Sequence, residues 1–341
     1  MADKITIKDI AKALNTTAAT VSRALHDHPR ISEEMKSRVL TYAMKNDFKI
    51  NKIASSLRSG NSNVIGVLIP SAEINFFGSV VHGIESMANT AGYSVLIFQT
   101  NETKEYEIKG LETFLSARVD GILVSLAKDT LEFDHFIKIK NLGIPIVFFD
   151  RYSDQLGISS VIVDDVKGGH LATVHLIQQG YKHIAHISGP LQIKAFQDRL
   201  IGYQKALEEN GIKYKSSMVY TGNISIEAGR EGLIELMKKN KTVDAVFAVE
   251  DFTALGVLKE VKVRGIKVPE EFGLIGFANE KFDEHLTPSL SSIDQQTVKM
   301  GQEAFNLILD QIKDKKSKIP MQLKTVQLVP IPFFRESSAR K

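Results

Sequence analysis

The sequence of 341 residues contains no cysteine, so the chain can form neither a disulfide framework nor a thiolate metal site. This absence fits a reducing cytosol. The N-terminal stretch MADKITIKDI lacks the apolar run of a secretory signal. Other apolar runs, such as VIGVLIP and IPIVFF, are too short to span a bilayer. We therefore expect a soluble cytoplasmic protein without a membrane partner.

Motifs of cofactor and catalytic chemistry are also missing. Gly168 and Gly169 lack the G-x-G-x-x-G spacing, and no G-x-x-x-x-G-K-[ST] loop occurs, which argues against a nucleotide cofactor. His183 and His186 fall in one expected strand but point to opposite faces, so they are poorly placed to share a metal. No order of Ser, His and Asp is specific enough to indicate hydrolysis. We expect no cofactor, no metal and no enzymatic activity.

An excess of basic over acidic residues is lacking except at the N-terminal end. The net charge is +3, but residues 1–60 carry 11 Lys/Arg against 6 Asp/Glu, while the remainder carries 32 against 34. This asymmetry is typical of a nucleic-acid-binding head on a neutral body, and a solvated helical face would also produce it.

Three short helices are expected in the N-terminal region, where no strand pattern occurs. Each follows a capping residue: Thr6 with Asp9 in a capping-box pattern, Thr17, and Ser32. Apolar residues at helical spacing predict the buried faces: Ile7, Ile10, Ala11 and Leu14, then Val21, Ala24 and Leu25, then Val39, Leu40 and Ala43. The stretch SGNSN at 59–63 is expected to be a linker.

From Val64 onwards, short apolar runs alternate with amphipathic helical segments. The runs are VIGVLIP, YSVLIFQ, GILVSL, IPIVFFD, SSVIVDD, HIAHISG, AVFAVED and FGLIGFA. Such alternation predicts parallel sheets covered by helices on both faces, and so many units exceed one ordinary sheet, so we expect two. Ligands of such folds bind at the carboxyl ends of the strands, where FFDR, VEDF and GFANE fall.

The stretch TIKDIAKALNTTAATVSRAL, at 6–25, joins two helical patterns through a turn of about three residues. Asn15 in this turn tolerates a left-handed backbone. The pattern predicts a helix-turn-helix, whose second helix enters the major groove of DNA. A small helical subdomain without a DNA role would share the bare pattern.

The ordered motifs identify a family. The chain resembles lactose-repressor-type (LacI-type) transcription regulators over essentially its whole length. The head matches in the stretch above, and the hinge and first core strand match in FKINKIASSLRSGNSNVIGVLIP. The core matches in PIVFFDR, VDDVKGGHLATVHLIQQGYKHIAHISGP, DRLIGYQKAL, AVFAVEDFTALG, VPEEFGLIGFANE and TPSLSSIDQ. The resemblance implies a helix-turn-helix head and a periplasmic-binding-protein-like core of two doubly wound parallel-sheet subdomains.

The resemblance also implies DNA contacts at particular residues. Phosphate contacts fall to Thr6, Ser22 and backbone amides near Asn15. The full expected set is Thr6, Thr17, Ala18, Ala19, Thr20, Ser22, Arg23, His26, Arg30, Asn51, Ala54 and Leu57. Within it, Ala18, Ala19, Thr20 and Arg23 face bases, and Leu57 is a minor-groove wedge in a hinge helix. Two departures weaken the hinge match: Ile50 stands where many members have Pro, and Ser55 replaces the usual Arg.

The same resemblance implies an effector site between the subdomains. Its expected residues are Phe76, Phe77, Asp150, Arg199, Asp251, Asn279 and Gln295. An aspartate at a strand end and an arginine fork suit a sugar or a related polar ligand, and phosphate-bearing ligands stay open. The residues alone favour a structural salt bridge for Arg199. Glu250 and Ala278 depart from the family, where many members carry an amide and an acid.

The expected organisation is a head at 1–49, a hinge helix and linker at 50–62, and a core at 63–341. We expect an N-subdomain at about 63–161 and 292–321 and a C-subdomain at about 162–291 and 322–341. The chain should cross between them near Val161–Asp165, Pro288–Asp294 and Ile319–Leu323. The predicted function is a homodimeric regulator that binds near-palindromic double-stranded DNA and responds to a small effector, most simply a carbohydrate. A solute receptor and an α/β enzyme are the alternatives.

Overall fold

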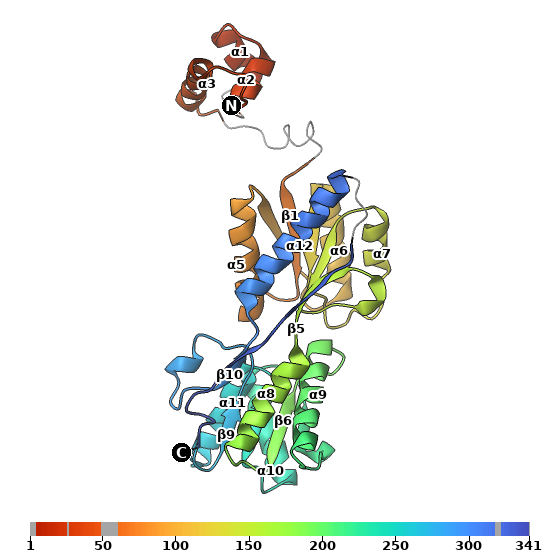
Figure 1. Ribbon diagram of the computed structural model, residues 1–341, viewed down its shortest axis with the longest axis vertical. Coiled ribbons are helices and arrows are strands. Elements are labelled where there is room, and N and C mark those ends of the chain that lie inside the picture. The colour runs from red at the N-terminus through yellow and green to blue at the C-terminus, as the bar shows by residue number, and fades with distance from the viewer. Residues whose placement is uncertain (1–4, 26, 49–60, 318–321, 341) are drawn as a thin grey trace. The chain divides into compact units, whose positions relative to one another are not determined.

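The computed structural model describes residues 5–25, 27–48, 61–317 and 322–340 (Figure 1). Contacts divide the chain into two units, Met1–Ser62 and Asn63–Lys341. We refer to them as the head and the core. Within the described part of the chain, no helix has the length and apolar character needed to cross a membrane.

Among its described residues the head contains three helices, α1 (Ile7–Ala13), α2 (Ala18–Leu25) and α3 (Glu33–Lys45). Its buried hydrophobic residues are Ile10, Ala11, Val21, Ala24, Val39 and Ala43. These faces agree with the expected ones except at Leu40, which is 42% exposed. The reason is helical spacing: Val39 and Ala43 are four residues apart and share the inner face, whereas Leu40 lies one residue round from it.

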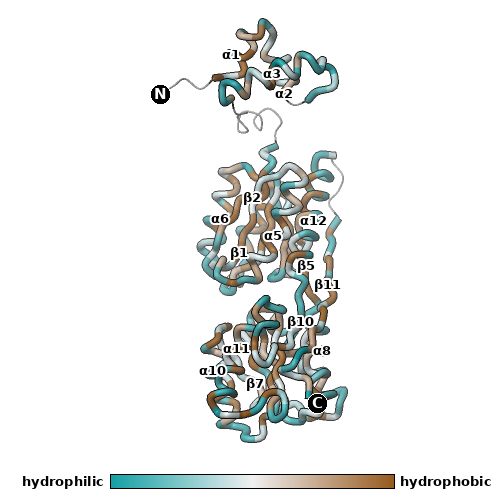
Figure 2. Tube along the Cα trace, turned by 90° about the vertical axis from the view of Figure 1, so that its left-hand side faces the viewer, coloured by the Kyte–Doolittle hydropathy of each residue, from teal (hydrophilic) through white to brown (hydrophobic). Residues whose placement is uncertain are grey.

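The first sheet of the core is six-stranded, and all its neighbouring pairs are parallel, in the order β11-β5-β4-β3-β1-β2. Its strands are β1 (Val64–Ile69), β2 (Ser94–Gln99), β3 (Gly121–Val124), β4 (Ile146–Phe149), β5 (Ser159–Val163) and β11 (Thr325–Leu328). Continuous apolar runs build the central strands because both faces are covered, and hydrophobic residues concentrate there in Figure 2.

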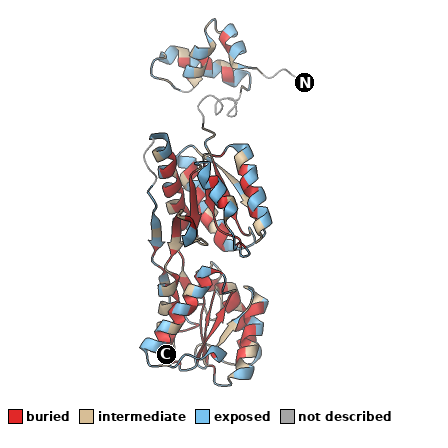
Figure 3. Ribbon diagram, turned by 90° about the vertical axis from the view of Figure 1, so that its right-hand side faces the viewer, coloured by how far each residue is buried: buried red, intermediate tan, exposed pale blue. Residues whose placement is uncertain are grey.

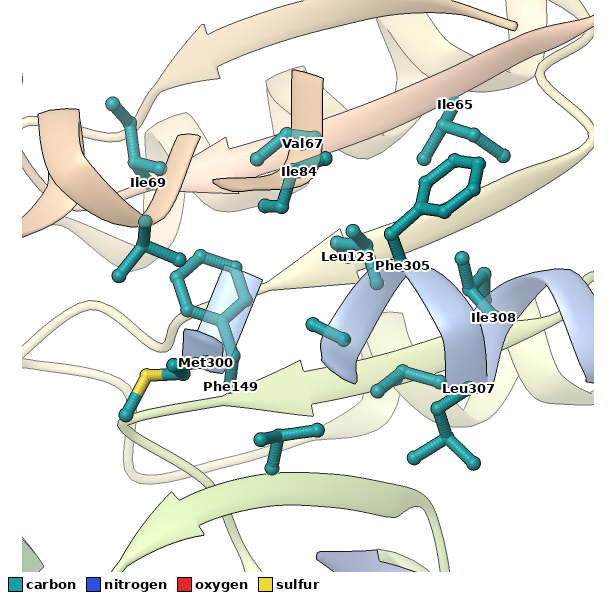
Figure 4. Close-up of a cluster of buried hydrophobic side chains, with 14 of the residues drawn as sticks. Ile65, Val67, Ile69, Ile84, Leu123, Phe149, Met300, Phe305, Leu307 and Ile308 are labelled. Carbon is teal, nitrogen blue, oxygen red and sulfur yellow. The ribbon is translucent and has the colours of Figure 1, made fainter. Parts of the chain in front are cut away.

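Helices cover both faces of this sheet. On one face, α5 (Asn75–Thr90) and α12 (Thr297–Ser317) pack against each other and the strands. Figure 4 shows part of this layer, where Phe305 and Ile308 of α12 face Ile65 and Leu123 of the sheet. On the other face lie α6 (Lys104–Ala117) and α7 (Asp134–Asn141).

The second sheet is four-stranded and parallel, in the order β7-β6-β8-β9. Its strands are β6 (Ile184–Ser188), β7 (Val219–Thr221), β8 (Ala245–Ala248) and β9 (Gly273–Ile275). One face carries α8 (Asp165–Gln178) and α9 (Lys194–Glu209), and the other carries α10 (Ile226–Lys239) and α11 (Asp251–Val263). In Figure 3 the strands of both sheets are mostly buried and the outer helix faces are exposed. The two expected doubly wound sheets are therefore present.

Three short 3-10 helices and one antiparallel ribbon complete the core. The 3-10 helices are η1 (Asp154–Leu156), η2 (Ser216–Met218) and η3 (Asp283–His285). The ribbon pairs β10 (Ser292–Asp294) with β12 (Ile331–Phe333), and isolated bridges join Ser291 and Asp294 to the second sheet.

The chain crosses between the subdomains after β5, after β10, and between β11 and β12. The first two crossings lie close to the expected positions. The third was expected at Ile319–Leu323 and is wrong, because β11 pairs with β5 in the first sheet. Residues 322–328 therefore belong with the N-subdomain. The strand was missed because it lies at a sheet edge and only Leu328 in it is buried.

Candidate functional site

The turn between α1 and α2 is fixed by local hydrogen bonds. Asn15 has φ 50, the left-handed conformation expected for it, and the Thr16 N–H donates to the Ala11 carbonyl at 2.9 Å. The Thr17 hydroxyl oxygen then accepts the Thr20 N–H at 3.1 Å and caps α2. The turn occupies four residues, 14–17, and holds the two helices at a defined angle.

The second helix presents one buried and one accessible face. Val21 and Ala24 are buried in the head, while Ala19 and Arg23 are exposed and Thr20 is half-buried. Ala18 and Ser22 are also half-buried, and Thr17 and Arg30 are exposed. This face combines small side chains, which let the backbone approach a groove closely, with an arginine fork. His26, Asn51, Ala54 and Leu57 lie outside the described residues.

Thr6 lies at the start of α1 and is committed to a capping box. Its backbone N–H and its hydroxyl donate to Asp9 Oδ2 at 2.9 and 2.6 Å, and the Thr6 hydroxyl oxygen accepts the Asp9 N–H at 3.4 Å. These hydrogen bonds to Thr6 hold the pKa of the Asp9 carboxyl below its usual range. Thr6 thus begins the helix, and both of its donors face Asp9.

The sequence analysis did not predict that Lys36, in the head, is buried and forms ion pairs. The Lys36 ammonium on α3 lies 2.6 Å from Asp27 and 2.6 Å from Glu33. Hydrogen bonds to these carboxylates raise the pKa of the lysine. The Glu33–Lys36 spacing of three residues was the available signal. The Asp27 partner, in the loop before α3, was not apparent from spacing.

In the core, a cavity of about 510 Å³ is lined by residues of both subdomains. They are Glu73, Ile74, Phe76, Phe77, Asp150, Arg151, Ile193, Ala195, Phe196, Arg199, Ile224, Ser225, Ile226, Glu227, Glu250, Phe252, Ala278, Glu280 and Gln295. The cavity lies at the carboxyl ends of β4, β8 and β9, where FFDR, VEDF and GFANE fall. Its volume is in the range of about 300–1,000 Å³ that is usual for small-molecule sites.

Arg199 is held in one orientation at the wall of this cavity. Its guanidinium donates to Asp165 Oδ1 at 2.8 Å, to the Val249 carbonyl at 2.7 Å and to Gln295 Oε1 at 2.9 Å. The group also stacks on the Phe277 ring, 3.7 Å from its centroid, and the residue is only 3% exposed. These partners account for three of the five N–H groups of the guanidinium. Arg199 is both a structural ion pair and a cavity residue.

Asp150 extends from the end of β4 with φ 58, a left-handed backbone that Asp tolerates better than most residues. Its carboxylate accepts the Ser125 hydroxyl at 3.5 Å and lies 3.8 Å from Arg151 Nε. Burial raises the pKa of this carboxyl to about 6, while Arg151 opposes the rise. Beside it, the rings of Phe76 and Phe77 meet edge to face at 5.1 Å.

Two expected cavity residues point elsewhere. Asp251 is fully buried, accepting the Ser292 hydroxyl at 2.7 Å and the Glu280 N–H at 3.0 Å. The Asn279 side chain accepts a hydrogen bond from Arg335 at 2.7 Å. Both residues therefore brace the loop after β9, and neither lines the cavity. The physical reason is local geometry: Asp251 is the first residue of α11, and Asn279 has a left-handed backbone with φ 56, so neither side chain follows the direction of the preceding strand.

The residues next to these two, Glu250 and Glu280, line the cavity and were not among the expected contacts, although Glu250 was noted as a departure from the family. Glu250 caps α11, its carboxylate accepting the N–H groups of Phe252 and Thr253 at 2.8 and 2.5 Å. Burial raises the pKa of Glu250 to about 7. Glu280 accepts the side-chain amide of Asn75 at 3.2 Å, a hydrogen bond that joins the two subdomains. Glu250 could have been found as the capping residue before a helix, and Glu280 carried no such signal.

His183 and His186 differ in environment because His183 lies just before β6, in which both were expected, and only His186 lies within this buried strand. His186 is buried and its Nδ1 lies 2.9 Å from the Phe247 carbonyl, whereas His183 is exposed. Burial lowers the pKa of His186 to about 4.

The fold and the two sites together define a DNA-binding regulator with a small-molecule cleft. Residues 6–51 match the family described as bacterial regulatory proteins, lacI family. Residues 62–336 match the family described as periplasmic binding proteins and sugar binding domain of LacI family. The chain belongs to the LacI family and is a DNA-binding transcriptional regulator with an effector-binding core.

Individual relatives are similar to this chain over most of its length. The ribose operon repressor of Halalkalibacterium halodurans is 31% identical over 310 residues, which are 91% of this chain and 91% of that protein. The structure of the lac repressor dimer bound to operator and the anti-inducer ONPF is similar with a TM-score of 0.86 at 23% identity, covering 98% of this chain and 99% of that one. A LacI family regulator from Enterococcus faecium, with bound ribose, gives 0.72 at 25% identity, covering 82% of this chain and 99% of that one.

Proposed function

We propose that the chain acts as a homodimer on a near-palindromic operator, and that a small polar effector in the core cavity changes its affinity for that operator. The observation that carries this proposal is a cavity lined from both subdomains with the Arg199 fork fixed in its wall. A two-fold dimer would bring two recognition helices to half-sites related by the same symmetry. The solved lac repressor assembly, described as a dimer bound to operator, supports this arrangement.

For the head, we propose that α2 reads the major groove. Ala18, Ala19, Thr20 and Arg23 would face base edges. Thr17, Ser22, His26 and Arg30 would contact the backbone or the periphery of the site, and Asn51, Ala54 and Leu57 the adjacent minor groove. The exposure of Ala19 and Arg23 supports the first group. Thr6, whose two donors face Asp9, would serve by positioning α1.

The wedge role proposed for Leu57 has its own test. An inserted leucine would unstack a base step at a cost of a few kcal/mol and bend the duplex. Leu57→Ala should therefore reduce both specific affinity and DNA bending in a fluorescence energy-transfer assay, while ligand binding by the core stays intact. Unchanged DNA bending would show that Leu57 does not insert between base pairs.

For the core, we propose that Phe76, Phe77, Asp150, Arg199 and Gln295 contact the effector. An arginine fork and a carboxylate suit hydroxyl groups of a sugar, and the two aromatic rings suit its C–H faces. The Enterococcus faecium regulator with bound ribose supports a carbohydrate as the class of ligand. Asp251 and Asn279 would act on the loop that carries Glu280.

Coupling between the cleft and the DNA follows from closure of the two subdomains. Three chain crossings permit a rigid-body closure, and the hydrogen bond from Asn75 to Glu280 joins the two subdomains in the present structure. An effector shifts this equilibrium only by binding one closure state better, and a coupling of about 1–3 kcal/mol is typical.

The test is DNA binding by the Arg199→Lys variant with and without effector. The lysine keeps the charge but loses the fork, so the effector response should vanish. If the effector-free form is the DNA-binding one, its operator affinity should stay within about threefold of the parent, well below a typical coupling factor. If the effector is a corepressor, the variant should fail to bind operator even with effector present. If the variant binds effector and responds to it normally, Arg199 does not contact the effector.

We also infer that the chain works by binding and not by catalysis, and that it works where the DNA is, in the cytoplasm. The curated relatives are named as regulators of transcription, which supports both inferences.

A further inference from the structure

The core cavity carries an excess of acidic side chains. Among its lining residues are five carboxylates and two arginines. The carboxylates are Glu73, Asp150, Glu227, Glu250 and Glu280. Such a lining attracts positive charge and repels negative charge, because potentials inside a low-dielectric cleft are focused.

Each of the two arginines forms an ion pair with a carboxylate that does not line the cavity. Arg199 forms its ion pair with Asp165 at 2.8 Å, and Arg151 pairs with Glu102 at 2.7 Å. Neither Asp165 nor Glu102 lines the cavity. The arginines therefore contribute donors and little net charge, and they do not balance the carboxylates that face the ligand space.

Three of the carboxylates lie deeper, and among the ion pairs of the described residues only Asp150 takes part in one, with Arg151. Asp150 is 3.8 Å from Arg151, which already serves Glu102. Glu250 accepts only from α11, at the N–H groups of Phe252 and Thr253 and the Thr253 hydroxyl. Glu280 accepts the neutral amide of Asn75. The other two, Glu73 and Glu227, are exposed, and Glu227 pairs with Arg230 at 3.2 Å.

The surrounding charges agree with this description. For Asp150 the charged neighbours are Arg151, Asp165 and Arg199; for Glu250 the neighbour is Asp251; and for Glu280 they are Lys281, Asp251 and Asp283. Burial raises the pKa of all three carboxyls, to about 6 for Asp150 and about 7 for Glu250. Burial therefore outweighs the nearby cations, which are Arg151 and Arg199 for Asp150 and Lys281 for Glu280.

Aromatic rings complete the cavity. Phe76, Phe77, Phe196 and Phe252 line it together with the carboxylates. Aromatic faces next to carboxylates are the chemistry that recognises an ammonium group, and the same faces pack against the C–H groups of a sugar ring.

We propose that the effector is an amine-bearing sugar, whose ammonium is bound by the carboxylates of Asp150, Glu250 and Glu280 and whose ring packs on the phenylalanines. This proposal rests on the proposed function only in taking the cavity as the effector site. It replaces the open choice between neutral, anionic and phosphate-bearing sugars with a positively charged class.

The experiment compares sugars of one skeleton that differ in charge. Isothermal titration of the full chain would use chitobiose, which carries two ammonium groups, N,N′-diacetylchitobiose, cellobiose and cellobionate, with glucosamine, N-acetylglucosamine and glucose as the single-ring set. We expect an amine to bind at least about tenfold more tightly than its neutral counterpart, the anion not to bind, and the preference to weaken with salt.

Proton release gives a second readout. At pH 6, Glu250 and Asp150 are partly protonated, and an ammonium favours their charged forms, so binding an amine should release protons while a neutral sugar releases none. Titration in two buffers of different ionisation enthalpy measures this release.

Charge-neutral variants test the residues. Glu280→Gln keeps an oxygen for Asn75 and should reduce the amine preference several-fold, as should Glu250→Gln, for which an unfolding curve checks the cap of α11. Glu112→Gln is the matched control, because Glu112 is exposed on α6 and does not line the cavity.

The proposal is overturned if no amine binds, if a neutral or anionic sugar binds as tightly, or if Glu112→Gln has the same effect as the cavity variants. A neutral sugar that binds and changes operator affinity would overturn the proposal and leave the proposed function intact. An amine that binds without changing operator affinity would support the proposal and contradict the coupling.

Discussion

The head and the core are built on different scales. The described part of the head buries six hydrophobic residues drawn from three helices within Ile10–Ala43. The core buries two sheets whose strands come from positions as far apart as Ser160 and Thr325, which pair in one ladder. In the head the proposed binding surface is one continuous helix, whereas the cavity collects residues from Glu73 to Gln295. Local sequence can therefore specify the first site, and only the tertiary fold assembles the second.

The largest expected effect is the loss of Arg199 from the core. Arg199→Ala leaves the buried Asp165 carboxylate without its partner at 2.8 Å, which should lower the free energy of unfolding of the core by about 3–5 kcal/mol. Arg230→Ala is the matched control, because its side chain is 50% exposed, and it should cost less than about 1 kcal/mol. Denaturant unfolding measures both variants. Equal losses would show that the Arg199 pair is not a structural element of the cleft.

The next largest effect is expected from a substitution that unfolds the head and leaves the core folded. Ile10→Ala removes a fully buried side chain from the six-residue cluster and should cost about 2–4 kcal/mol, enough to unfold so small a unit. DNA binding should disappear while ligand binding and thermal unfolding of the core stay unchanged. Leu40→Ala, at a position 42% exposed in the same head, should leave DNA binding intact. Loss of core ligand binding in Ile10→Ala would contradict the independence of the two units.

A smaller effect concerns specificity. Arg23 is exposed on α2, and Arg23→Ala should weaken binding to the selected operator by about 1–3 kcal/mol while random duplex is affected less. Competition binding at fixed salt checks this. Equal weakening on both DNAs would make Arg23 a phosphate contact.

The smallest effect is a helix cap. The Ser32 hydroxyl oxygen accepts the Met35 N–H at 3.3 Å, so Ser32→Ala should destabilise α3 by about 1 kcal/mol. Hydrogen exchange of the α3 amides should quicken accordingly, and Ser32→Asp should restore protection. If the alanine and aspartate variants exchange alike, the cap contributes nothing.

The contrast also explains what the sequence could predict. Asn15, Thr17 and Ser32 act on neighbours within a few residues, so their turn and capping roles were predictable, and buried strands were recognisable from their apolar runs. Asp251 and Asn279 were assigned to the cavity, which Glu250 and Glu280 line instead, because side-chain directions after a strand depend on local backbone conformation, such as the φ of 56 at Asn279, that the sequence does not specify. The edge strand β11 had too few buried residues to be recognised.

The central claim is that the chain recognises a specific operator through its head. The most direct measurement is selection of duplexes from a random library by the full chain, followed by titration of the enriched sequence across a range of salt concentrations. We predict an enriched near-palindrome whose half-sites are related by two-fold symmetry, bound at least about a thousandfold more tightly than random DNA at physiological salt and with a steep salt slope. Enrichment of no sequence, or equal affinity for enriched and random duplexes, would contradict the account.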